Sequence, residues 1–164
     1  MTDEDIQQMI ELKKTLQKKD IQKILSPKQE YGHYRSDVKL LAASRHTFLL
    51  RTRRSIYDEF DFSVILSVHT KDGANFNLMR CNGPSHVHRN MIEDTKIIGP
   101  HRHIATQRYI EFGGDAEGFA ESVDVYKSFN EALEYMMKAA NISTQQIDGN
   151  NLSLFQEEGG DEDG

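Results

Sequence analysis

Between residues 61 and 81 the chain alternates apolar and polar side chains, and this period of two constrains the fold more than any other feature. The apolar positions of the first stretch are Phe62, Val64, Leu66 and Val68. Such alternation is typical of a strand with one buried face. Lys71-Asp72-Gly73 follows, and Asp-Gly is a favoured pair in tight hairpin turns. We therefore predict antiparallel strands at 61–69 and 74–81.

Two more strands are predicted upstream, at 38–42 and 45–53. In the second of these, the alternation sets Phe48, Leu50 and Thr52 on one face. The opposite face then carries three arginines: Arg45, Arg51 and Arg53. With a further strand at 105–112, we expect an antiparallel meander of about five to six strands.

Both ends of the sequence have helical periodicity. Apolar positions recur at helical spacing over residues 3–25, Thr2 is a suitable N-cap, and Ser26-Pro27 ends the pattern. We expect the lysine pairs at 13–14 and 18–19 on the exposed side of this helix. Near the other end, Ser128 and Glu131 form a capping box, and the apolar face that follows consists of Phe129, Ala132, Leu133, Met136, Met137 and Ala140. The predicted fold class is α+β, an antiparallel sheet packed by an N-terminal helix and a C-terminal helix.

Length and composition favour one domain. A chain of 164 residues is close to the size that one hydrophobic core supports, so we expect a single domain over 1–155. Residues 156–164 are acidic and rich in glycine, and we expect a disordered tail there. The N-terminus is acidic, no apolar segment is long enough to cross a bilayer, and Cys81 is the one cysteine. These features predict a cytoplasmic protein with no signal peptide, membrane contact or internal disulfide.

The net charge of −6 is distributed unevenly. Residues 35–110 carry twelve Lys and Arg against seven acidic residues, whereas residues 111–164 carry two against thirteen. A basic middle is typical of a surface that contacts phosphates, and RNA contact through Arg45, Arg51 and Arg53 is one interpretation. A solvated sheet face beside an acidic tail explains the same charges.

Histidines recur in a repeated pattern within residues 81–103. Gly-Pro occurs twice there, followed first by His86 and His88 and then by His101 and His103. In a strand, residues i and i+2 share a face. If a turn at Asp94-Thr95 closes a hairpin, position 88 falls opposite 101 and position 86 opposite 103. All four imidazoles would then lie on one face, close enough to meet.

Three interpretations of this pattern stay open. In the first, the segment binds zinc, with candidate ligands His86, His88, His101, His103 and Cys81. Glu93 or Asp94 would orient one of the imidazole rings by accepting a hydrogen bond from its second nitrogen. In the second, the histidines perform acid–base catalysis without a metal, and the catalytic set is His101, His103, Arg102, Arg108 and Tyr109. In the third, the histidines only stabilise a loop, as we expect for His33, His46 and His69.

Three segments carry a resemblance to known proteins. Residues 78–86 (Leu-Met-Arg-Cys-Asn-Gly-Pro-Ser-His), residues 99–106 and the helix at 126–140 resemble an uncharacterised family of small proteins from phages and mobile elements of Gram-positive bacteria. Gly-Pro-His-Arg-His-Ile, at 99–104, is also similar to a segment of TumE-type toxins, which are suspected ribonucleases. A mobile-element setting also includes anti-CRISPR proteins, which are commonly compact and acidic.

Two functional hypotheses follow, and the sequence leaves enzyme activity undecided. The favoured one is a zinc-stabilised, non-enzymatic protein that binds and inhibits a protein or nucleoprotein partner of the host, with a CRISPR effector as one candidate. Its support is that only histidine and arginine stand out as chemical groups. The alternative is a ribonuclease-like toxin of a toxin–antitoxin system that uses the His-x-His pairs.

Overall fold

The computed structural model describes residues 1–145 and contains four helices and eleven strands within that range. The helices are α1 (Asp3–Glu11), α2 (Lys18–Leu25), α3 (Gln107–Phe112) and α4 (Phe129–Ala139). The long strands are β3 (His33–Ala42), β4 (Thr47–Ser55), β5 (Phe62–His69) and β6 (Asn75–Asn82). The short strands are β1 (Lys14–Leu16), β2 (Lys28–Glu30), β7 (Val87–Asn90), β8 (Thr95–Ile98), β9 (His101–Ile104), β10 (Phe119–Ser122) and β11 (Ile142–Thr144).

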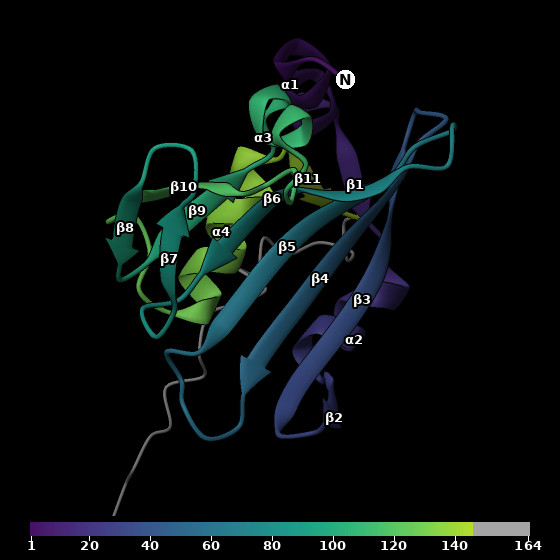
Figure 1. The fold of residues 1–164 in the computed structure, drawn as a ribbon. Helices are drawn as coiled ribbons and strands as arrows, with labels where there is room; N and C mark the ends of the chain where they lie inside the picture. The colour runs from purple at the N-terminus through teal and green to yellow at the C-terminus, as the bar shows by residue number, and fades with distance from the viewer. Residues whose placement is uncertain (146–164) are drawn as a thin grey trace, which may run out of the picture.

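Nine of these strands form one sheet, with the order β10-β9-β6-β5-β4-β3-β1-β11 and β2 paired beside β3. All described pairs in the sheet are antiparallel except β1 with β11. Strands β7 and β8 form a separate hairpin at one side of the sheet (Figure 1). The predicted α+β class is confirmed, and the sheet has more strands than the five to six expected.

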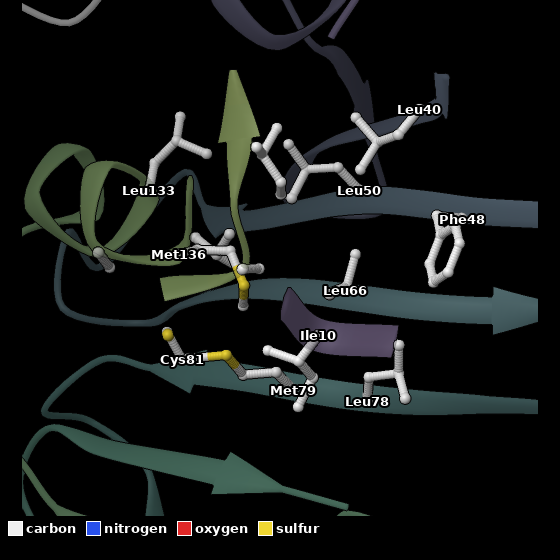
Figure 2. Packing of buried hydrophobic residues seen from close by; sticks show 14 of the residues in the cluster. Ile10, Leu40, Phe48, Leu50, Leu66, Leu78, Met79, Cys81, Leu133 and Met136 are labelled. Atoms are coloured by element: carbon white, nitrogen blue, oxygen red, sulfur yellow. The ribbon is translucent and has the colours of Figure 1, made fainter. Parts of the chain in front are cut away.

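One face of the sheet is covered by helices. Alternate residues of β3 to β6 point to this face and pack with α1, α2 and α4 in a single hydrophobic core. Leu133 and Met136 of α4 lie over the sheet, close to Leu50, Leu66 and Cys81 (Figure 2). Burial of apolar area of this kind is the main stabilising contribution to a domain of this size. The opposite face of the sheet is therefore free to carry polar residues.

The strands predicted at 38–42, 45–53, 61–69 and 74–81 are present as β3 to β6; the ends of the last three shift by at most two residues, whereas β3 begins at His33, five residues before the predicted start. Phe48, Leu50 and Thr52 are buried on the core side of β4, and Arg51 and Arg53 lie on the other face. Arg45 precedes the strand. The capping box of Ser128 and Glu131 is present at the start of α4.

The single N-terminal helix predicted over 3–25 is wrong, because residues 14–16 form strand β1 between α1 and α2. Lys14 pairs with Ile142 of β11 and is fully buried, whereas the prediction placed it on an exposed face. Its ammonium donates to the carbonyl oxygens of Ile10, Leu12 and Ala140 at 2.8 to 3.0 Å. Lys14 thereby satisfies carbonyls at the ends of two helices, which is how a buried ammonium is tolerated.

The strand predicted at 105–112 is also wrong, because residues 107–112 form helix α3. The Thr106 side chain caps its first turn by accepting from the Tyr109 backbone N–H. Gly113 ends the helix in the left-handed conformation, with φ 85°. The acidic tail predicted at 156–164 lies outside the described residues. Within the part that is described, no helix is both long and apolar enough to span a membrane.

Candidate functional site

The sheet face opposite the core, here called the polar face, carries a row of hydrogen-bonding side chains. Neighbouring strands place Arg53 opposite Ser63, Ser63 opposite Asn82, and Asn82 opposite His101. A second row runs through Arg51, Ile65, Arg80 and His103. The polar face therefore brings together the arginines of β4 and β6 and the histidines of β9.

The hairpin predicted between the two His-x-His pairs is wrong in its register. Residues 87–90 pair with 95–98, so that His88 lies opposite Ile97. His101 and His103 instead belong to β9, which joins the main sheet between β6 and β10. The reason is that β9 gains two neighbouring strands there, whereas a hairpin offers it one. The four histidines consequently divide into two groups.

The first group, here called the Asn82 cluster, consists of Asn82, His88, His101 and His103. The ring centroid of His88 lies 4.5 Å from that of His103 and 5.9 Å from that of His101, and the last two rings are 5.0 Å apart. His101 is fully buried and His103 is 5% exposed. Three of the four predicted histidines therefore lie together, with His101 and His103 buried and His88 partly buried.

Hydrogen bonds in the Asn82 cluster define which ring nitrogens of His101 and His103 donate and which accept. His101 Nδ1 lies 2.7 Å from the Gly99 carbonyl oxygen and His103 Nδ1 lies 2.9 Å from that of Glu117, so both Nδ1 atoms donate. The Asn82 amide then donates to both Nε2 atoms, at 3.3 and 3.2 Å. Burial, with the neighbouring histidines, lowers the pKa of His103 to about 3, and burial also lowers the pKa of His101. Both imidazoles are neutral at physiological pH.

In the Asn82 cluster, the Nε2 atoms of His101 and His103 face the Asn82 amide. Donation of one ring nitrogen to a backbone carbonyl is common among metal-binding histidines. Here, however, the other nitrogen of His101 and of His103 accepts from Asn82. No group of three or more His, Cys, Asp or Glu within residues 1–145 is placed to hold a metal ion. Zinc binding by this segment stays a prediction from the sequence.

The second group, here called the Asp61 cluster, consists of His33, Arg53, Asp61 and His86. Asp61 Oδ1 accepts from Arg53 and from His86 Nε2, each at 2.9 Å. His33 Nε2 lies 3.9 Å from Asp61 Oδ2 and accepts a hydrogen bond from the Arg53 guanidinium. The four side chains are between 22% and 30% exposed. Two imidazoles and a guanidinium thus meet at one carboxylate that solvent can reach.

The protonation states in the Asp61 cluster follow from its hydrogen bonds. Burial raises the pKa of Asp61, but the Arg53 hydrogen bond and charge and the adjacent His86 outweigh it, so that the pKa lies below its usual value. Asp61 is therefore ionised at neutral pH. In the tautomer in which His86 donates through Nε2 to this carboxylate, its Nδ1 atom carries the lone pair. An imidazole held in this tautomer by a carboxylate is suited to accept a proton.

The loop after β6 positions His86. Gly83 donates to the Phe62 carbonyl at 3.0 Å, and Ser85 Oγ donates to Asp58 Oδ2 at 2.6 Å. A Cβ atom on Gly83 would lie 2.2 Å from the Phe60 carbonyl oxygen, so only glycine permits this approach. The loop is thereby held against the start of β5, where Asp61 is located.

Aromatic side chains lie beside the Asp61 cluster. Tyr57 is 86% exposed and its ring lies next to Gly32, which directly precedes His33. Tyr31 is 98% exposed, and its carbonyl oxygen accepts from His33 Nδ1 at 3.1 Å. Arg35, on the same strand face as His33, is also exposed. Exposed rings and arginines next to a group of histidines are a suitable surface for single-stranded nucleic acid.

The other predicted site residues lie apart from both clusters. Cys81 is on the core side of β6 (Figure 2), where burial raises the pKa of its thiol to about 12. Arg102 is on the same side and contacts Tyr135 and Glu121. Arg108 pairs with Glu93, and Tyr109 Oη donates to the same carboxylate at 2.7 Å. Glu93 thus contacts these two residues, and Asp94 pairs with Arg89, so neither acid orients a histidine of the Asn82 cluster.

Sequence analysis did not identify His33 or Asp61 as site residues. Both lie at the ends of strands, where alternation no longer indicates which face a side chain occupies. The available signal was Arg53, which was assigned to the polar face and whose neighbours across β3 and β5 are Arg35 and Ser63. Only with that strand register known can His33 and Asp61 be placed next to Arg53.

The fold and the two clusters define an α+β protein whose sheet is covered by helices on one face. The other, polar face carries the partly exposed Asp61 cluster. The chain belongs to DUF6978, a family of unknown function that matches residues 1–161. No curated protein and no solved structure matches the chain.

Proposed function

We propose that the protein binds RNA on the polar face and cleaves it at the Asp61 cluster. The observation that carries the proposal is the convergence of His33, Arg53 and His86 on the Asp61 carboxylate at a solvent-accessible position. This is the ribonuclease hypothesis of the sequence analysis, with a different set of catalytic residues.

The chemistry requires a base, an acid and a positive charge. His86 Nδ1 removes the proton of a ribose 2′-hydroxyl, whose oxygen attacks the adjacent phosphorus. The bond from phosphorus to the 5′-oxygen breaks, and the leaving oxygen takes a proton from water that reaches this partly exposed position. The products are a 2′,3′-cyclic phosphate and a free 5′-hydroxyl. Arg53 neutralises the charge that develops on the phosphoryl oxygens.

Binding of the RNA is supported by the surroundings of the Asp61 cluster. Arg35 and Arg51 extend the positive charge along β3 and β4, and Arg51 has one weak partner, Asp37, at 3.8 Å. Tyr31 and Tyr57 offer exposed rings for base stacking. Arg35, Arg51 and Arg53 lie on this same face, and at physiological salt exposed charges more than about 10 Å away are largely screened.

The test is incubation of the purified protein with a fluorescent RNA oligonucleotide, followed by mass analysis of the product ends. We expect a 2′,3′-cyclic phosphate and a loss of at least about 100-fold in rate for His86→Asn. His69→Asn is the matched control, because His69 is exposed at the far end of β5. Intact RNA with the wild-type protein, or equal rates for the two variants, would refute the proposal.

A second candidate is the inhibitor of a host protein or nucleoprotein, for which the β7–β8 hairpin gives support. Val87 and Ile98 lie opposite each other and are 61% and 69% exposed, and Met91 at the turn is 63% exposed. Exposed apolar groups of this kind are typical of protein contact surfaces. Val87→Ser/Ile98→Ser should weaken partner binding without affecting RNA cleavage. A pull-down with a purified CRISPR effector complex would measure the binding.

A further inference from the structure

A pocket of about 550 Å³ opens on the polar face beside the Asp61 cluster. Its lining consists chiefly of Arg51 on β4, Asn77 and Arg80 on β6 and Glu117 in the loop before β10, with Phe76 and Ile110 also at its wall. Arg51 is two residues from Arg53 on the same strand face, a distance of about 7 Å. A ligand in this pocket can therefore be continuous with one at the Asp61 cluster.

One carboxylate oxygen of Glu117 can accept a hydrogen bond from a ligand. It is 5% exposed, and its Oε1 atom accepts from Asn77 Nδ2 and from Arg80, each at 2.6 Å. Within residues 1–145, the hydrogen bonds to this carboxylate all end on Oε1. Oε2 is thus available for a donor, and the two neighbouring contacts fix its direction.

Two arginines provide donors in the same pocket. Arg80 donates to Glu117 through Nη2, while its Nε atom is buried with no hydrogen-bond partner among the described residues. Arg51 is 36% exposed, and among residues 1–145 its ion-pair partner is Asp37, at 3.8 Å. An unpaired buried donor costs free energy, so a ligand acceptor near Arg80 would be stabilising.

We propose that this pocket binds a guanine nucleotide unit of RNA. Guanine is the base that presents two adjacent donors on one edge, N1–H and the 2-amino group, and these match the free oxygen of Glu117. Its O6 acceptor then faces Arg80, the base lies against the apolar part of the wall at Ile110, and the phosphate pairs with Arg51. The volume is within the range of pockets that hold ligands of this size.

This inference rests on the proposed function, because guanine is proposed as the base of the nucleotide on the 5′ side of the cleaved phosphate. It deepens that proposal in one respect, since it predicts preferential cleavage after guanosine. The pocket and the Asp61 cluster are formed by different residues, so they can be tested separately.

The experiment is isothermal titration calorimetry of the full chain with nucleoside monophosphates. We expect GMP to bind more tightly than AMP and UMP, and IMP, which lacks the 2-amino group, to bind about tenfold more weakly than GMP. Equal affinity for GMP and UMP, or no heat of binding with any nucleotide, would overturn the assignment.

Two variants separate the contacts. Glu117→Gln keeps the shape and the bonds to Asn77 and Arg80 but replaces the free acceptor by a donor, so GMP affinity should fall at least about tenfold. Arg51→Gln should weaken GMP several-fold and leave guanosine unaffected, whereas the control Lys39→Gln, on an exposed part of β3, should change neither. Thermal melting checks that each variant is folded. Unchanged GMP affinity in folded Glu117→Gln would refute the pocket assignment.

Failure of this inference and failure of the proposed function give different results. Binding of GMP requires no cleavage. A protein that binds GMP selectively and leaves RNA intact would support the pocket and refute the nuclease. A protein that cleaves RNA without selective GMP binding would refute the pocket alone.

Discussion

The Asp61 cluster and the Asn82 cluster contain the same kind of side chain in opposite environments. His33 and His86 are 22% and 30% exposed and meet a carboxylate. His101 and His103 are almost solvent-free and meet an amide and two backbone carbonyls. An imidazole in the first environment can exchange protons with a ligand, whereas one in the second is held neutral by desolvation.

The comparison shows that a histidine pattern does not reveal which of its members are available for chemistry. The His-x-His repeat drew attention to His101 and His103, and these are the least accessible of the histidines concerned. His86 belongs to the same segment, but the 83–86 loop directs it to Asp61. Burial and the type of neighbouring acceptor separate a structural histidine from a functional one.

The largest effect is expected at the centre of the exposed group. Asp61→Asn removes the charge that holds the His86 tautomer and pairs with Arg53, so the RNA cleavage rate should fall about 100- to 10,000-fold. Stopped assays with a labelled oligonucleotide measure this. The control Asp37→Asn, whose carboxylate is 74% exposed beside Arg51, should keep most of the activity. A similar loss in both variants would mean that the charge of the face, and not the Asp61 cluster, is responsible.

In the buried Asn82 cluster, we expect a substitution to lower the free energy of unfolding. His103→Ala leaves the Glu117 carbonyl and one N–H of the Asn82 amide without their hydrogen bond to His103 and creates a cavity, which should cost about 2–4 kcal/mol of unfolding free energy. Urea denaturation monitored by circular dichroism gives the value. His69→Ala, at an exposed position, should cost under about 0.5 kcal/mol. Equal costs would contradict the structural role of the Asn82 cluster.

The buried group also predicts how stability depends on pH. The pKa of His103 is lowered to about 3 in the folded protein by burial, while the unfolded chain has the ordinary value near 6.5. The unfolded state therefore binds a proton first as pH falls, and stability is lost from about pH 6.5 downward. By pH 5 this loss is about 2 kcal/mol relative to neutral pH. Urea titrations at pH 7 and pH 5 should show it, and His103→Ala should have a smaller pH dependence. An identical dependence in the variant would argue against the neutral buried state.

The smallest effect is expected from metal removal. Because Asn82 already donates to the ring nitrogens that zinc would use, treatment with EDTA should shift the melting temperature by less than about 1 °C. Mass spectrometry of untagged protein purified without chelator reports the metal content directly. Stoichiometric zinc that is lost in His88→Ala/His101→Ala would show that Asn82 gives way to a metal, and the zinc hypothesis would replace our account of this cluster.

The parts of the fold that the sequence predicted correctly are those determined locally. Alternation fixed the faces of β4 and β5, and the capping box of Ser128 fixed the start of α4. The parts it missed depend on distant partners. Lys14 became a strand residue because β11, more than 120 positions away, pairs with it. The Asp61 cluster likewise needs three chain segments, at His33, Asp61 and His86, whose meeting follows from sheet order and not from any local pattern.

The most direct test of the account compares His86→Asn with His101→Asn in one experiment that records both the RNA cleavage rate and the melting temperature. We predict that His86→Asn loses at least about 100-fold in rate and melts close to the wild type. His101→Asn should melt at a clearly lower temperature and retain most of its cleavage rate per folded molecule. The reverse result, with activity lost in folded His101→Asn and kept in His86→Asn, would contradict the division into an exposed functional group and a buried structural one.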